Sequence, residues 1–85
     1  MLSHYAVHAP LQAKPAMTTS YTAIPEAERQ GKPAYAAMIE SVDQSVGNIM
    51  RTLENLGLDK RTLVLFTSDN GGSVKATDNS PLRGN

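Results

Sequence analysis

Apolar and polar residues follow a clear helical pattern in one part of the chain, between residues 33 and 56. Apolar side chains recur there at spacings of three and four, which places them along one face of a helix. Pro33 suits the first turn of such a helix, and Gly57 suits its C-terminal end. We expect one long amphipathic helix over about residues 33–56, whose apolar face comprises Tyr35, Met38, Ile39, Val42, Val46, Ile49, Met50, Leu53 and Leu56.

A second pattern is the unbroken apolar run from Leu63 to Phe66. Because this run does not alternate with polar residues, neither of its faces is expected to meet water. Such a run is typical of a central strand in a parallel sheet. We therefore predict a strand over about residues 62–68.

The N-terminal part of the chain predicts a short strand over about residues 2–7, which would stop before Pro10 because proline cannot donate to a strand ladder. Residues 8–32 read as a long loop, with a helical turn near residues 25–29. Strand, crossover helix and strand form a βαβ unit. We therefore expect an α/β fold that forms the βαβ portion of a mostly parallel central sheet.

Two oxygen-bearing side chains, Asp69 and Asn70, directly follow the second predicted strand. Gly71 and Gly72 let the backbone leave extended geometry, so both side chains can converge on one point. Hard cations such as calcium and magnesium bind carboxylate and amide oxygens, usually several at once. Asn-Gly is also a strong hairpin signal, but residues 73–81 do not alternate as a returning strand would. The pattern favours part of a metal site.

His8 follows the first predicted strand. In a parallel sheet both strands end at the same edge, where open α/β sheets bind ligands. His8 would then lie near Asp69 and Asn70 and could face the metal site. A capping or buried structural histidine is the alternative for His8, and His4, in the middle of the predicted strand, is expected to be structural.

Composition excludes several classes of function. The 85 residues carry eight acidic and eight basic side chains without a basic stripe, so nothing indicates a nucleic acid or an anionic membrane as partner. Cysteine is absent, which excludes a disulfide or a cysteine nucleophile within these residues. The apolar runs are too short to cross a bilayer, and the N-terminus has no signal-peptide pattern. A chain of this length buries only a marginal core.

Four sequence blocks, in this order and spacing, resemble the middle part of a sulfatase of the arylsulfatase type, in the alkaline phosphatase superfamily. The resemblance implies a partial sulfatase domain over residues 1–85, with residues 69–85 as the metal-site loop. The blocks are Tyr5-Ala-Val-His8-Ala-Pro10-Leu-Gln-Ala, Tyr35-Ala-Ala-Met38-Ile-Glu-Ser-Val-Asp43-Gln-Ser-Val-Gly47, Thr67-Ser-Asp69-Asn70-Gly-Gly72 and Pro81-Leu-Arg83-Gly84.

The resemblance also implies roles for individual residues. Asp69 and Asn70 match the family's metal-binding pair, which holds calcium together with two upstream aspartates; magnesium is the alternative ion. His8 matches the catalytic histidine that contacts the sulfate group and assists departure of the leaving group. The family's nucleophile is a formylglycine made from an upstream Cys or Ser, and no such signature occurs here. We therefore expect this chain alone to be inactive.

By resemblance, the parent protein would hydrolyse sulfate esters of small molecules or glycans, in the periplasm or outside the cell. Three alternatives stay open. The parent could be a phosphate or phosphonate ester hydrolase of the same superfamily, marked by an upstream Thr or Ser nucleophile. The chain could be a truncated, non-catalytic relative. It could also be a small stand-alone binding module with a hairpin at Asn70-Gly71.

Overall fold

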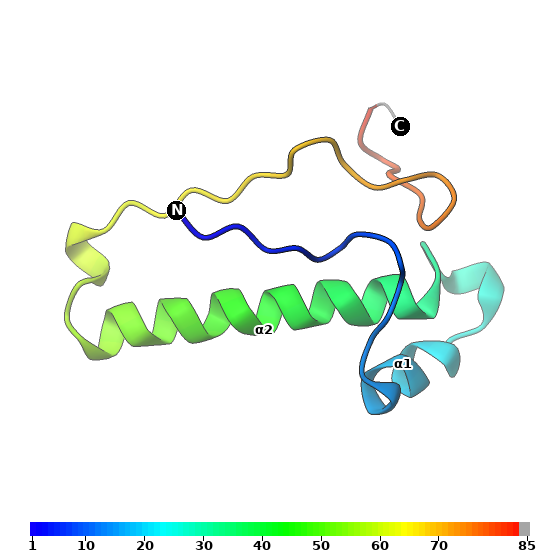
Figure 1. Ribbon diagram of the computed structural model, residues 1–85, viewed down its shortest axis with the longest axis horizontal. Helices are drawn as coiled ribbons and strands as arrows, with labels where there is room; N and C mark the ends of the chain where they lie inside the picture. Colours follow the sequence, from blue (N-terminus) through cyan, green and yellow to red (C-terminus); the bar gives the residue numbers. More distant parts are fainter. Residues whose placement is uncertain (84–85) are drawn as a thin grey trace.

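The computed structural model of the chain describes residues 1–83. Figure 1 shows α2 as the long axis of the molecule, with α1 beside its N-terminal half. The N-terminal segment and the segment after α2 both run along the same side of α2 in this view, in the same direction. The helical elements are α1 (Pro15–Thr22), the 3-10 helix η1 (Glu26–Glu28), α2 (Pro33–Asn55) and the 3-10 helix η2 (Asp59–Arg61).

The long helix predicted from the apolar spacing is observed as α2, which has 23 residues. Pro33 occupies its first position, where the missing N–H has no intrahelical partner to lose. Gly57 ends it with a φ of 67°, the left-handed conformation that glycine adopts without strain. The Leu58 N–H donates to the Leu53 carbonyl and the Gly57 N–H to the Glu54 carbonyl, which together form a Schellman motif.

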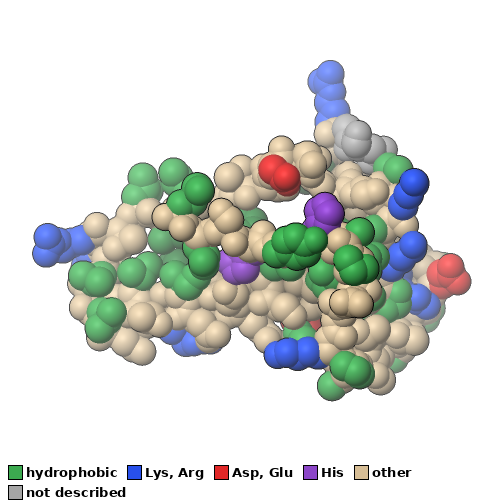
Figure 2. All heavy atoms as spheres, viewed as in Figure 1, with side chains coloured by type: hydrophobic (Ala, Val, Ile, Leu, Met, Phe, Trp, Pro, Cys, Tyr) green, Lys and Arg blue, Asp and Glu red, His purple; other side chains and the backbone are tan. Residues whose placement is uncertain are grey.

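The prediction that the chain forms a βαβ portion of a parallel sheet is wrong. Among residues 1–83 there is no strand, and pairing of the β type is limited to an isolated antiparallel bridge between Gly31 and Thr77. Residues 2–7 and 62–68 lack the backbone ladder that defines strands. Figure 2 shows an opening between the two segments. An apolar run indicates a tendency to be buried, but a strand also needs a backbone partner, which these residues do not supply.

The long loop predicted over residues 8–32 is wrong in part, because it contains α1. This helix has little amphipathic character, and its threonines bond back to the helix: Thr18 to the Lys14 carbonyl, and Thr19 to the Pro15 carbonyl. The helical turn predicted near residues 25–29 is confirmed as η1, with Pro25 directly before it. The predicted metal-site loop, residues 69–85, includes residues 84 and 85, which lie outside the described residues.

The small core lies where α1 packs against α2. Ala37 is fully buried and Met38 is 8% exposed. The Ser41 hydroxyl donates to Met17 Sδ at 3.7 Å across this contact. Tyr21 of α1 hydrogen-bonds to the Glu40 carboxylate, which raises the pKa of Tyr21, and burial adds to the effect. No described helix has the length and apolar character that a membrane span requires.

The apolar run after α2 stays outside this core. Leu63 is 84% exposed, Leu65 is 83% exposed and Phe66 is 75% exposed. Since burial of one large apolar side chain is worth about 1.5–3 kcal/mol, the described residues leave a large part of their hydrophobic driving force unused. The chain therefore has a marginal core.

Gly47 lies inside α2, and a Cβ added there would meet only the Arg51 guanidinium, at 3.4 Å or more. We expect Gly47→Ala to raise the free energy of unfolding by about 0.5–1 kcal/mol, because glycine loses more backbone entropy in a helix than alanine does. Circular dichroism and urea unfolding would measure the change. Ala37→Leu is a control that should lower the free energy of unfolding, because it adds volume at a fully buried position. An unchanged or lower stability for Gly47→Ala would contradict the packing described here.

Candidate metal turn and histidine

Asp69 and Asn70 lie in a tight turn after the extended segment. Gly71 has a φ of 75°, and its N–H donates to the Ser68 hydroxyl at 3.1 Å. This backbone reversal brings the two side chains together. One terminal atom of the Asn70 amide lies 3.2 Å from Asp69 Oδ1 and 3.0 Å from the Gly71 carbonyl oxygen.

This atom is the amide nitrogen, because an oxygen there would face only other acceptors. The nitrogen donates to Asp69 Oδ1 and to the Gly71 carbonyl oxygen. The turn is therefore closed by its own amide, and the Asn70 side chain would have to rotate before its oxygen could join Asp69 around a cation.

The described residues hold only part of a metal site. Within residues 1–83, no group of three His, Cys, Asp or Glu side chains lies close enough together to hold a metal ion. A calcium ion takes six to eight oxygen ligands. The oxygens of Asp69, Asn70 and Gly71 would thus need further ligands from elsewhere.

The side chain of Asn79 closes the loop that follows this turn. Asn79 Nδ2 donates to the Gly72 carbonyl at 2.7 Å, and the Gly72 N–H donates to Asn79 Oδ1 at 3.2 Å. A Cβ on Gly72 would collide with a methyl group of Thr77 and would lie 2.8 Å from the Tyr35 hydroxyl. Glycine is therefore required at position 72 by close packing.

The same loop is tied to the start of α2. The Lys32 N–H donates to the Ala76 carbonyl, and the Asp78 N–H donates to the Gln30 carbonyl, both at 2.8 Å. The Gln30 side chain donates to the carbonyls of Asp78 and Ser80, at 2.9 and 2.8 Å. Sequence reasoning missed Gln30 and Asn79, because a polar residue in a loop gives no local signal of a distant backbone partner.

His8 lies on the exposed N-terminal segment. Its Nδ1 lies 2.8 Å from the Ala9 carbonyl, which can only accept, so Nδ1 carries a proton. The ring packs at a tilt against Tyr5, with 5.4 Å between ring centroids. No hydrogen bond among residues 1–83 uses His8 Nε2, and this nitrogen can donate to a ligand only when the ring is the imidazolium.

Within the described residues, His8 bonds to Tyr5 and Ala9 and makes no hydrogen bond to Asp69 or Asn70. His4 has a different surrounding, because its Nε2 lies 2.9 Å from the Ser45 hydroxyl of α2. This contact fits the structural role expected for His4.

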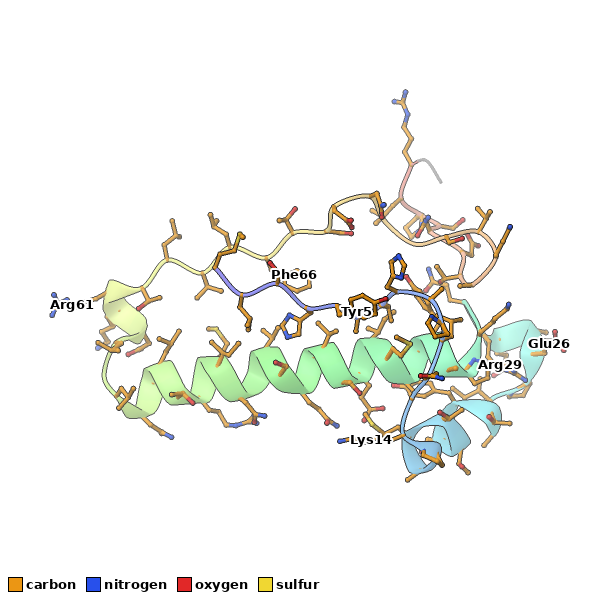
Figure 3. All side chains as sticks on the ribbon, in the orientation of Figure 1. Tyr5, Lys14, Glu26, Arg29, Arg61 and Phe66 are labelled. Atoms are coloured by element: carbon orange, nitrogen blue, oxygen red, sulfur yellow. The ribbon has the colours of Figure 1, made fainter. Side chains whose placement is uncertain are left out.

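Cationic side chains of the described residues do not gather at one place on the visible face. Figure 2 shows the Lys and Arg side chains spread around the edge of this face, and both histidines nearer its middle. In Figure 3, Arg61 and Arg29 lie at opposite ends of the molecule, and Tyr5 lies on the N-terminal segment between them.

Comparison with known proteins adds independent evidence. The family model described as Sulfatase matches residues 1–85. The chain is 35% identical to a sulfatase of Formosa agariphila, over 93% of this chain and 16% of the relative. It is 34% identical to mouse arylsulfatase J, over 98% of this chain and 14% of the relative. It is 44% identical to mouse N-acetylgalactosamine-6-sulfatase, over 53% of this chain and 9% of the relative. No solved structure matches the chain.

The pH dependence of the loop should report on Asp78. Its carboxylate accepts hydrogen bonds from the Ser80 N–H and hydroxyl, which hold the pKa of Asp78 below its usual 3.8. Because the pKa is lower in the folded state, this stabilisation is present above pH 3.8 and is lost as the pH falls through the folded pKa. We expect an NMR titration of the Asp78 carboxyl to shift upward in Ser80→Ala. Equal titration curves in both proteins would contradict the hydroxyl bond.

Proposed function

Since this chain belongs to the sulfatase family, we propose that it forms part of the active site of an enzyme that hydrolyses sulfate esters. The family model covers the whole chain. The chain spans 16% and 14% of the length of two curated relatives that it matches over most of its own length. The activity of the complete protein therefore remains our proposal, and small-molecule or glycan sulfate esters are the substrates we propose.

The observation that carries this proposal is the match of the sulfatase family model to residues 1–85, which include Asp69 and Asn70. We propose that Asp69 and Asn70 bind a calcium ion, with magnesium as the alternative. In the described turn the Asn70 amide nitrogen donates to Asp69 Oδ1 and to the Gly71 carbonyl, so binding of an ion would replace these hydrogen bonds with metal–oxygen contacts. Calcium binds oxygens at about 2.3–2.6 Å in flexible geometry. When bound, such an ion polarises an oxygen of the ester group as a Lewis acid.

His8 is the second proposed participant. The Ala9 carbonyl fixes the ring through Nδ1, so Nε2 is the nitrogen that can meet the substrate. As an imidazolium, His8 would donate from Nε2 to the bridging oxygen of the ester, or to a sulfate oxygen, as that bond breaks. The formylglycine nucleophile that we expect by resemblance would come from a segment outside these residues, so we propose that this chain is inactive alone.

The metal proposal predicts that Asp69→Asn weakens calcium binding in the complete enzyme, because it removes the one charged ligand of this turn. We expect kcat/KM for an aryl sulfate to fall by more than about 100-fold and to recover in part at high calcium concentration. Calorimetry would measure affinity, and Asp59→Asn, in η2 at the other end of α2, is the matched control. Unchanged calcium affinity in Asp69→Asn would exclude this residue as a ligand.

The proton-donor role of His8 predicts a dependence on the leaving group. His8→Ala should lower kcat by about 10²–10⁴-fold for alkyl sulfates. The loss should be smaller for nitrophenyl sulfate, whose leaving group departs without protonation. His4→Ala, which removes a contact to Ser45, should show no such dependence. An equal loss for both substrates in His8→Ala would rule out proton donation to the leaving group.

A further inference from the structure

We propose that Asn79 is a positioning residue that holds the 69–72 turn in the shape needed to bind the metal ion, with Gln30 anchoring its loop. This inference rests on the function proposed above. It concerns residues that do not touch the ion but act on the backbone next to its ligands. Its basis is the hydrogen bonding of the described loop, residues 72–80.

The amide of Asn79 uses both of its ends on one residue of the turn. Asn79 Nδ2 and Oδ1 bond to the carbonyl and the N–H of Gly72, in the way that a neighbouring strand would. Because both amide atoms face Gly72, Asn79 is placed as a support and not as a metal ligand. Gly72 directly follows Gly71, whose carbonyl accepts a hydrogen bond from the Asn70 amide and could instead bind an ion. A shift at Gly72 would therefore move a candidate ligand.

A residue of α2 also confines Gly72. The hydroxyl of Tyr35, a residue in the first turn of α2, lies within 2.8 Å of the place where a Cβ would stand. The Asn79 amide and the Tyr35 hydroxyl thus limit the position of the same backbone unit. A long helix supplies one of these limits, and the loop itself supplies the other.

Gln30 extends this support to the end of the loop. Its side-chain amide donates to the carbonyls of Asp78 and Ser80, on both sides of Asn79. The three residues 78–80 are thereby fixed relative to the start of α2, and Asn79 projects from a fixed backbone. Such pre-organisation lowers the entropic cost of ordering the turn when an ion binds.

The test compares Asn79→Ala with Asn48→Ala in the complete enzyme. Asn48 is the matched control because it is an exposed asparagine of α2 whose side chain bonds to Arg51. We expect calcium affinity, measured by calorimetry, to fall about 10–100-fold in Asn79→Ala, the range usual for residues that orient metal ligands. High calcium should restore kcat, because the ligands themselves remain. Asn48→Ala should bind calcium as the wild type does.

A second readout needs no metal. In the calcium-free enzyme, amide hydrogen exchange at Gly72 should be faster in Asn79→Ala, because Asn79 Oδ1 accepts from that N–H. If Asn79→Ala does not fold, Gln30→Ala carries the same test, with Gln44→Ala as its control. Gln44 is an exposed residue of α2 that bonds to Glu40 on the same helix.

The outcomes separate the two proposals. Wild-type enzyme that binds neither calcium nor magnesium would overturn the proposed metal site, and the positioning role with it. Wild-type enzyme that binds calcium, together with Asn79→Ala that binds it equally well, would overturn the positioning role alone. Weaker binding in Asn79→Ala that excess calcium restores supports both. Weaker binding with unchanged exchange at Gly72 would also overturn the positioning role, since the turn would not have loosened.

Discussion

Backbone pairing between residues 30–32 and 76–78 is the constraint on which the arrangement of the candidate site depends. Two N–H groups and two carbonyls, paired at 2.8 Å, join parts of the chain that α2 and the exposed apolar segment otherwise separate. Closing so long a loop costs chain entropy, although this cost grows only slowly with loop length. The Gln30 side chain adds two further bonds at the same place. This closure and the contact of Gly72 with the Tyr35 hydroxyl hold the 69–72 turn near the N-terminal end of α2.

The sequence predicts the features that depend on nearby residues. The spacing of apolar residues predicts α2, and Pro33 and Gly57 predict its ends, because those signals act within one or two turns. The turn after Asp69 follows from two glycines in the same way. The two strand predictions are wrong because a strand depends on a distant part of the chain: it exists only when another backbone pairs with it. The run from Leu63 to Phe66 carries no information about that partner.

The candidate site shows the same division. Asp69, Asn70 and His8 could be named from residue type and order, because the resemblance marks them. Gln30 and Asn79 could not, because the function of each depends on a backbone group that only folding brings near, 48 residues away for Gln30 and Asp78. α1 was missed because its threonines satisfy the carbonyls of their own helix and leave little amphipathic pattern.

The exposed segment after η2 makes the chain prone to self-association. Residues 62–68 carry no charge, no proline and no glycine, a composition that favours stacking of identical segments into cross-β aggregates. Arg61 on one side and Asp69 on the other act as gatekeepers. While Leu63, Leu65 and Phe66 stay exposed, this segment can pair with the same segment of another copy. Any contact that covers these three side chains would therefore lower the tendency of the chain to aggregate.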